Sequence, residues 1–426
     1  MMQDMECGIK YGLIGESLSH SYSKAIHGFL GNHEYGLLEL RPDAVEGFLG
    51  KADFQGINVT IPYKETVMPH CVPDVAAEKI GSVNTIVNKG GKLYGYNTDY
   101  SGFSYMAKNA GIDFAGKKVL VLGSGGTSKT AVCVARDSNA REIVVVSRNG
   151  KDNYENIGDH ADADILVNTT PVGMFPDNGL APVSLDCFKG LSAVIDVIYN
   201  PLRTRLLLDA MERGIKTANG LAMLTAQALY AHNLFFGIEP GEDAGGISNA
   251  GGMPNDDGMR ISETLAKTEK LFQNVVLIGM PGSGKTSVGK KLAKILEMDF
   301  VDTDLMIEAN AGRKVHDIIR MYGEPYFRKQ EASVIARVAA KTCQVIATGG
   351  GSVLAKENRD ALLQNGTIVF LERNLACLST EDRPLSVDLQ TMYYYRRPIY
   401  EGLCHHKVKA GDSLEDTVDK VRQVLS

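Results

Sequence analysis

Two glycine-rich segments have the composition of turns that bind phosphate groups. The second, GMPGSGKT at residues 279–286, satisfies the pattern G-x-x-x-x-G-K-[ST]. In such a loop the backbone N–H groups hold phosphates, the lysine reaches the β- and γ-phosphates, and the final hydroxyl binds Mg²⁺. The segment therefore predicts a nucleoside triphosphate site built from Gly282, Ser283, Gly284, Lys285, Thr286 and Ser287.

Two carboxylates that follow this loop suit phosphoryl transfer. Asp302 and Asp304 occupy alternate positions of VDTD, so both side chains point to one face of an extended strand end. Asp304 could activate the hydroxyl group of an acceptor, while Asp302 could join Thr286 in holding Mg²⁺ through water. Guanidinium groups bind carboxylates bidentately. The arginines that suit an acidic acceptor are Arg328, Arg383 and Arg396.

The first glycine-rich segment, GSGGTSK at residues 123–129, favours a dinucleotide. It lies between an apolar run and an expected helix, whose N-terminus can bind a pyrophosphate. Ser128 stands where a strict G-x-G-x-x-G pattern has its third glycine, so a plain turn is the alternative. The next expected strand ends at Ser147 and Arg148, and an arginine there favours NADP because it can pair with the 2′-phosphate. The alternative is an incidental arginine on a solvated strand end.

Small polar side chains end several apolar runs within residues 1–100. Asn58, Thr60 and Lys64 follow one run, whereas Asn84 and Asp99 follow the next two. Amides and hydroxyls at several strand ends suit a polyhydroxylated ligand, with Lys64 and Asp99 available for proton transfer. Each residue alone is more often a turn residue, and the charged pair could be a structural ion pair.

The elements that must position these residues are the strands and helices of α/β domains. Short apolar runs rich in Val and Leu precede both glycine-rich segments, as in strands buried on both faces of a parallel sheet. We expect a substrate-binding domain at residues 1–100, completed by a helix at 219–238, and a Rossmann-type domain at 101–218. A linker at 239–272 then leads to a P-loop domain at 273–426.

The expected linker is rich in Gly, Asn, Asp and Pro, and only its last part, SETLAKTEKLF, favours a short helix leading into the final domain. A flexible coil there would let the flanking parts move nearly independently. An Ω-loop within one domain is the alternative interpretation.

Composition excludes several classes of function. Lys and Arg number 45 against 51 Asp and Glu, a net charge of −6 that disfavours nucleic-acid binding. Seven scattered cysteines without a C-x-x-C pair indicate free thiols in a reducing compartment. There is neither a basic-then-apolar leader nor an apolar stretch of transmembrane length, so we expect a cytoplasmic protein without membrane partners.

The first half of the chain resembles shikimate dehydrogenase. The motifs that carry the resemblance appear in family order: SHSYS at 19–23, NVTIPYK at 58–64, SVNT at 82–85, NTD at 97–99, DVIYNP at 196–201 and TAQA at 225–228. The resemblance implies reduction of 3-dehydroshikimate to shikimate by NADPH, with Lys64 as the proton donor and Asp99 as its partner. Lys24 departs from the family pattern, which usually has proline there.

The same resemblance implies two sets of binding residues. Those for shikimate are Ser21, Ser23, Asn58, Thr60, Lys64, Asn84, Asp99, Tyr199 and Gln227. Those for NADP are Gly123, Ser124, Gly125, Gly126, Thr127, Ser147, Arg148, Val197 and Gly220.

Residues 273–426 resemble shikimate kinase. Besides the phosphate loop and the two aspartates, the shared motifs are FR at 327–328, ATGGG at 347–351, DRPL at 382–385 and RRPIY at 396–400. The resemblance implies transfer of a phosphoryl group from ATP, with Mg²⁺, to the 3-hydroxyl of shikimate, with Lys285 and Asp304 as catalytic residues. The implied shikimate-binding residues are Asp304, Arg328, Gly350 and Arg396, and Arg383 belongs to a lid over ATP. The lid segment is short and lacks a further arginine of many relatives.

The two resemblances point to one ligand, because the product of the first reaction is the substrate of the second. We therefore interpret the chain as a bifunctional enzyme of the shikimate pathway. One alternative replaces the first activity with a quinate/shikimate dehydrogenase. The other is a non-catalytic ligand sensor, which the presence of Lys64, Asp99, Lys285 and Asp304 disfavours.

Overall fold

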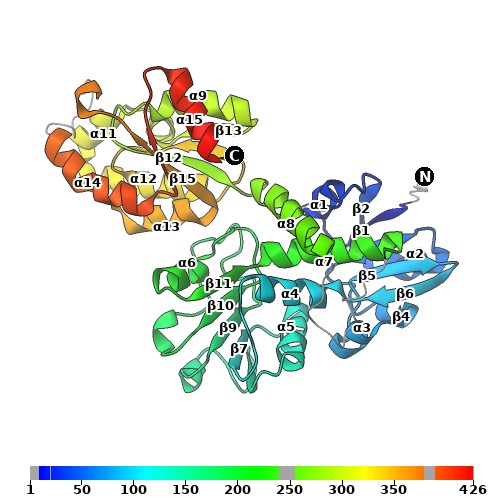
Figure 1. Cartoon of the computed structure of the whole chain (residues 1–426). Coiled ribbons are helices and arrows are strands. Elements are labelled where there is room, and N and C mark those ends of the chain that lie inside the picture. Colours follow the sequence, from blue (N-terminus) through cyan, green and yellow to red (C-terminus); the bar gives the residue numbers. More distant parts are fainter. Residues whose placement is uncertain (1–8, 20, 239–254, 379–388, 426) are drawn as a thin grey trace. The chain divides into compact units, whose positions relative to one another are not determined.

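The computed structural model describes residues 9–19, 21–238, 255–378 and 389–425. These residues form two compact units (Figure 1). The first comprises residues 1–172, 182–199 and 209–269, and the second comprises residues 173–181, 200–208 and 270–426. Each unit is built on parallel or mostly parallel sheets, which confirms the predicted α/β class.

The first unit begins with a six-stranded mixed sheet in the order β2-β1-β3-β5-β6-β4. β1 pairs in parallel with β2 and β3, whereas β5 is antiparallel to both β3 and β6. The strands are β1 Tyr11–Gly15, β2 Tyr35–Glu39, β3 Gly56–Val59, β4 Val72–Pro73, β5 Thr85–Lys89 and β6 Lys92–Tyr96. The helices between them are α1 Ser23–Phe29, α2 Val45–Lys51 and α3 Val75–Ile80.

The same unit continues into a five-stranded parallel sheet in the order β11-β10-β9-β7-β8. Its strands are β7 Lys118–Leu122, β8 Glu142–Val146, β9 Ile165–Asn168, β10 Ala193–Asp196 and β11 Lys216–Asn219. All five residues of β7 are buried, as the apolar run KVLVL predicted. The helices of this part are α4 Thr98–Asn109, α5 Gly126–Asp137 and α7 Gly220–Phe236, whereas α6 Arg205–Glu212 is divided between the two units after Leu208.

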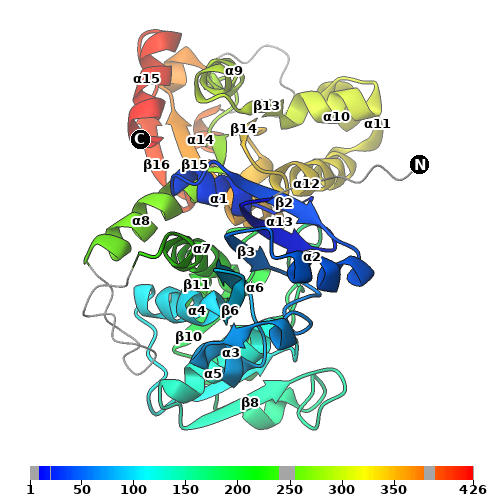
Figure 2. The same cartoon turned by 90° about the vertical axis from the view of Figure 1, so that its right-hand side faces the viewer.

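Two long helices of the first unit, α4 and α7, lie side by side (Figures 1 and 2). A further helix, α8 (Asn255–Lys270), packs on α7, where Ile261 is fully buried beside Ala226 and Leu229. The Asn233 amide of α7 also bonds the carboxylate of Asp257 at 3.3 Å. Along this part of the chain the division between the two units falls at Lys270, the end of α8.

The second unit holds a five-stranded parallel sheet in the order β13-β14-β12-β15-β16. Val276 and Ile278 of β12 pack into one core, whereas Val275 and Leu277 pack into another, so the strand is buried on both faces. The strands are β12 Asn274–Ile278, β13 Asp299–Asp302, β14 Gln344–Ala347, β15 Gly366–Glu372 and β16 His406–Lys409. The helices are α9 Lys285–Leu296, α10 Thr303–Ala311, α11 Val315–Tyr322, α12 Glu324–Ala339, α13 Lys356–Asn365, α14 Leu389–Leu403 and α15 Leu414–Leu425.

No helix within the described ranges is both long enough and apolar enough to cross a membrane.

Candidate active sites

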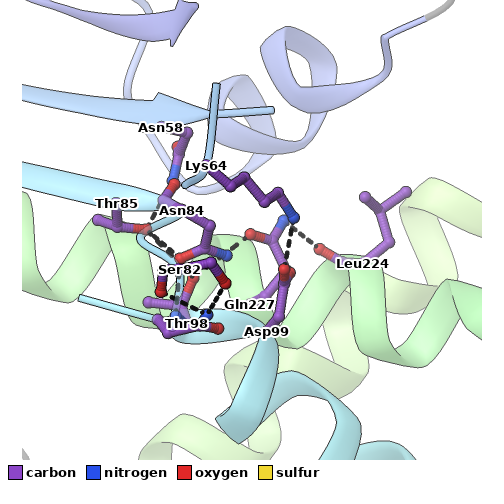
Figure 3. A network of polar contacts seen from close by, with 10 residues as sticks. Asn58, Lys64, Ser82, Asn84, Thr85, Thr98, Asp99, Leu224 and Gln227 are labelled. Atoms are coloured by element: carbon purple, nitrogen blue, oxygen red, sulfur yellow. Dashed lines mark hydrogen bonds and ion pairs between the residues drawn. The ribbon is translucent and has the colours of Figure 1, made fainter. Parts of the chain in front are cut away.

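Lys64 and Asp99 form an ion pair in the first unit (Figure 3). Lys64 lies in the turn after β3, and Asp99 lies in the first turn of α4. The Lys64 Nζ donates to Asp99 Oδ2 at 2.6 Å, and the two side chains are 25% and 14% exposed. The pair is thus half-buried yet still reached by solvent, as a group that exchanges a proton with a ligand must be.

A buried network of amides and hydroxyls lies beside this pair (Figure 3). The Asn58 amide Nδ2 donates to Thr85 Oγ1 at 3.0 Å and to the Asn84 carbonyl at 3.4 Å. Asn84 Oδ1 accepts from the backbone N–H of Thr98 at 2.8 Å. Thr98 Oγ1 in turn donates to Gln227 Oε1 of α7 at 3.5 Å. These bonds fix the orientation of amides that come from β3, β5 and α7.

The remaining predicted shikimate-binding residues lie around this network. Ser21 and Ser23 stand at the start of α1, where the Ser23 backbone N–H donates to Ser21 Oγ at 3.3 Å. Thr60 directly follows β3 and lies against Gly15 of β1, where a Cβ would be 2.6 Å from the Thr60 Cγ2. The ring of Tyr199 meets that of Tyr22 edge-on, with centroids 6.3 Å apart.

The predicted NADP residues gather at the carboxyl ends of neighbouring parallel strands. Gly123 adopts φ 101° after β7, and a Cβ there would lie 2.9 Å from Thr169 Oγ1. Gly220 begins α7, and a Cβ there would lie only 1.9 Å from the Val197 carbonyl, so glycine is required. Gly125, Gly126 and Thr127 begin α5 after Ser124, while Ser147 and the exposed Arg148 follow β8, the strand beside β7.

Helix α5 also carries an ion pair at each end. Lys129 Nζ lies 2.6 Å from the carboxylate of Glu65, the neighbour of Lys64 in the chain. At the other end Asp137 accepts from Lys79 of α3 at 2.7 Å. The helix that begins at the glycine loop is therefore tied to the turn that carries Lys64.

The second unit holds the phosphate loop between β12 and α9, where the sequence predicted it. Gly279 and Gly284 adopt φ 147° and 95°, conformations that favour glycine. Lys285 is buried, and its Nζ donates to the carbonyls of Gly279 and Met280, each at 2.9 Å. Gly282, Ser283 and Ser287 complete the loop and the first turn of α9.

Two aspartates follow the loop as predicted, but they face different partners. Asp302 Oδ2 accepts from Thr286 Oγ1 at 2.7 Å, so the two residues expected to hold Mg²⁺ are in contact. Asp302 Oδ1 caps α10 by accepting from the backbone N–H groups of Asp304 and Leu305. Burial, and after it the nearby carboxylates of Asp302 and Glu331, raise the pKa of Asp304 to about 6, whereas Lys285 lowers it.

Arg328 of α12 lies beside the glycines that follow β14. A Cβ on Gly351 would lie 2.7 Å from Arg328 Nη2, and one on Gly349 would lie 2.7 Å from Asp304 Oδ1. These contacts place Arg328 and Asp304 along one short glycine segment. Arg328 also donates to Glu331 Oε2 at 2.8 Å and to Glu324 Oε1 at 2.9 Å.

Arg396 of α14 reaches the same glycine segment through Tyr400. Tyr400 donates to the Gly350 carbonyl at 2.5 Å. Burial raises the pKa of Tyr400 to about 12, whereas Arg396, which is hydrogen-bonded to it, lowers that pKa. The predicted set Asp304, Arg328, Gly350 and Arg396 is thus assembled in one place, whereas Arg383 lies outside the described residues.

Glu331 is a site residue that sequence reasoning missed. It is 1% exposed and accepts from Ser352 Oγ at 2.6 Å as well as from Arg328. A buried carboxylate needs such partners, and this one holds the guanidinium in place. The sequence feature that could have indicated this role is the spacing of Glu331, which follows Arg328 by three residues and so lies on the same face of the helix.

Comparisons with known proteins identify the families of both parts of the chain. Residues 13–86 match the family model of the shikimate dehydrogenase substrate binding domain, and residues 281–426 match that of shikimate kinase. The NADP(+)-dependent shikimate dehydrogenase of Clostridium perfringens is 39% identical over 258 residues, which cover 54% of this chain and 93% of that protein.

Solved structures show the same relationship. The chorismate mutase/shikimate 5-dehydrogenase fusion protein from Clostridium acetobutylicum is 32% identical, covers 61% of this chain and 96% of its own, and has a TM-score of 0.54. Shikimate 5-dehydrogenase from Thermus thermophilus, solved with NADP(H) and shikimate, is 30% identical with a TM-score of 0.51 over 60% of this chain and 98% of its own. The chain therefore belongs to the shikimate dehydrogenase family and carries a shikimate kinase domain at residues 281–426.

Proposed function

We propose that this chain catalyses two consecutive reactions, the NADPH-dependent reduction of 3-dehydroshikimate to shikimate and the ATP-dependent phosphorylation of shikimate at its 3-hydroxyl. The observation that carries the proposal furthest is the Lys64–Asp99 pair at 2.6 Å, set beside a buried network of oriented amides. Family membership supports both activities.

In the first reaction Lys64 donates a proton to the carbonyl oxygen of the substrate as negative charge develops there. Asp99 keeps the ammonium group oriented and accepts from the hydroxyl that results. Asn58, Asn84 and Gln227 bind the ring hydroxyls. Ser21 and Ser23 bind the carboxylate, with Thr60 and Tyr199 at the edges of the ring.

The glycine loop fits NADP because a Cβ on Gly125 or Gly126 would meet nothing within 4 Å, so this face of the loop is open. Arg148 would pair with the 2′-phosphate. When bound, the cofactor supplies the hydride. Lys129 and Glu65 then keep the loop helix beside the turn of Lys64.

In the second reaction Asp304 accepts the proton of the shikimate 3-hydroxyl as it attacks the terminal phosphate. Arg328 and Arg396 bind the carboxylate of shikimate. The loop at 279–286 fits ATP because the backbone N–H groups at the start of α9 and the Lys285 ammonium are the donors that phosphates need. Thr286 and Asp302 would hold Mg²⁺, which neutralises charge on the phosphates when bound, and Arg383 would cover ATP.

A coupled assay of the purified full chain tests the proposal. We supply 3-dehydroshikimate, NADPH, ATP and Mg²⁺, and follow NADPH loss and ADP formation separately. Lys64→Met should reduce NADPH loss by at least about 100-fold and leave ADP formation intact when shikimate is added. Lys285→Met should do the reverse. Wild-type protein that lacks either activity would contradict the corresponding half of the proposal.

The proposal includes a cytoplasmic location. Cys71, Cys133, Cys187, Cys343 and Cys404 are free thiols, as expected in a reducing compartment.

A further inference from the structure

Tyr35 is a buried polar side chain that the mechanism above does not use. It begins the edge strand β2 and is only 2% exposed. Its ring stacks on the imidazole of His27 from α1, with centroids 3.9 Å apart and planes 8° apart. A tyrosine buried this deeply must place its hydroxyl on a partner, because an unpaired buried hydroxyl is costly.

The Tyr35 hydroxyl has two partners, and both belong to the proposed shikimate site. It donates to Asn58 Oδ1 at 2.7 Å. It is also hydrogen-bonded to the Ser23 side chain, an interaction that lowers the phenol pKa, whereas the larger effect of burial raises it well above 10. The phenol is therefore neutral, and its proton lies on the bond to Asn58.

This bond helps to set which way the Asn58 amide faces, together with a hydrogen bond between Asn58 and the His27 side chain. Because Oδ1 accepts from the phenol, Nδ2 points the other way. It donates to Thr85 Oγ1 at 3.0 Å and to the Asn84 carbonyl at 3.4 Å. Without the hydroxyl, Oδ1 would be a buried acceptor with one donor fewer, and the amide could rotate. The orientation of Asn58 thus depends on a residue on another strand, 23 positions earlier in the chain.

We propose that Tyr35 is a positioning residue of the dehydrogenase site, whose hydroxyl orients Asn58 and Ser23 toward a substrate that bears both a carboxylate and ring hydroxyls. The inference rests on the proposed function, because Asn58 and Ser23 bind shikimate only there. Tyr35 touches no reacting atom and acts through these two side chains, so it should affect substrate binding more than chemistry.

The test is Tyr35→Phe in the full chain, which keeps the ring on His27 and removes only the hydroxyl. We expect the KM for shikimate in the oxidation direction to rise roughly five- to tenfold, with kcat and the KM for NADP⁺ changed less than about twofold. Tyr11→Phe is the matched control. Tyr11 of β1 pairs with Tyr35 across the two strands and is also buried, at 4% exposed. Its hydroxyl donates to Gln55 Oε1, which is not among the predicted site residues. It should lose stability without a change in KM.

Repeating the Tyr35→Phe substitution in an Asn58→Leu variant separates an effect on the orientation of Asn58 from a general loss of structure. Asn58→Leu should raise the KM by itself, and adding Tyr35→Phe should then raise it by less than Tyr35→Phe does in the wild-type chain, because only the bond to Ser23 is left for the hydroxyl to act through. The double variant also serves if Tyr35→Phe alone does not fold, because it leaves no Asn58 oxygen buried without the Tyr35 donor.

Three outcomes would overturn the inference. The first is an unchanged KM in Tyr35→Phe, and the second is an equal rise in KM in Tyr11→Phe. The third is a rise as large in the Asn58→Leu background as in the wild-type chain when Tyr35→Phe is added. Failure of the proposed function is distinct, because the wild-type chain would then oxidise no shikimate at all, and the inference would fall with it.

Discussion

The two candidate active sites of this chain differ in the charge that they bury. At the first site the buried network is made of neutral groups, and Asn58, Asn84 and Thr85 satisfy one another. The charged pair, Lys64 with Asp99, cancels and stays half-exposed. At the second site Glu331 is a fully buried carboxylate and Asp304 a partly buried one, and Asp302 lies in the same region.

This difference in buried charge indicates how each site is arranged before its ligand binds. A neutral network can be fully satisfied before any ligand arrives, so it can hold amides in fixed orientations. Crowded carboxylates repel one another, and burial and repulsion raise the pKa of Asp304 to about 6. The Asp304 carboxylate is therefore held in an unfavourable charged form in the folded state, which binding of the Mg²⁺ cation nearby would offset.

The largest expected effect removes the charge at Asp304. Asp304→Asn should lower the kcat for ADP formation by about 100- to 10,000-fold, because the proposed base is lost. NADPH oxidation by the same chain is the control and should be unchanged. A variant that keeps most of its kinase activity would show that Asp304 is not the base.

The same substitution should make the kinase domain more stable. The pKa of Asp304 is about 6 in the folded state against an ordinary value of 3.8, so the folded state holds the proton more tightly. The resulting penalty is absent below about pH 4 and is complete above about pH 6, where it amounts to about 1–3 kcal/mol. Asp304→Asn should therefore raise the free energy of unfolding at pH 7, as measured with urea.

Asp302→Ala is the matched comparison and should act in the opposite direction. Asp302 caps α10, so its loss should lower stability by about 0.5–2 kcal/mol. If Asp304→Asn destabilised the domain as Asp302→Ala does, Asp304 would be a structural residue rather than a strained functional one.

The pH dependence of the two activities sharpens the comparison further. The kcat/KM for phosphorylation should fall about tenfold per pH unit below about pH 6, because protonated Asp304 cannot accept the substrate proton. The amides and hydroxyls that bind the ring in the dehydrogenase site do not titrate there. A kinase profile that stays flat down to pH 5 would contradict this assignment.

The smallest effect is expected at the exposed ion pair between Lys129 and Glu65. Lys129→Gln should raise the KM for NADPH by less than about fivefold, and the difference should shrink at high salt, because exposed pairs are weak and screened. Lys79→Gln breaks the pair at the other end of α5 and should leave the KM for NADPH unchanged. Equal effects of both variants would mean that α5 merely loses stability.

Much of both sites could be predicted from contiguous motifs. The roles of the loop at 279–286 and of the pair Asp302 and Asp304 could be predicted from the sequence, because residues that are close together in a strand–loop–helix unit also lie close together in space. The dinucleotide loop needed further support, since Ser128 breaks its pattern. Arg328 and Arg396 needed the family resemblance, because nothing local distinguishes them from surface arginines.

Other features depend on contacts between distant segments. The bond of Ser352 to Glu331 joins α12 to the segment after β14, and that of Tyr35 to Asn58 joins strands separated by β1. The docking of α8 on α7 is of the same kind, since Asp257 and Asn233 lie on either side of a glycine-rich stretch. No spacing rule predicts such pairs.

By itself, the sequence determined the α/β class, the two nucleotide loops and the identity of the residues whose side chains can take part in catalysis or binding. Short-range backbone geometry and residue type suffice for these. The tertiary structure alone decided which polar groups are buried together. That outcome sets the direction of the Asn58 amide and the raised pKa of Asp304, because desolvation and hydrogen bonding act only between groups that folding has brought into contact.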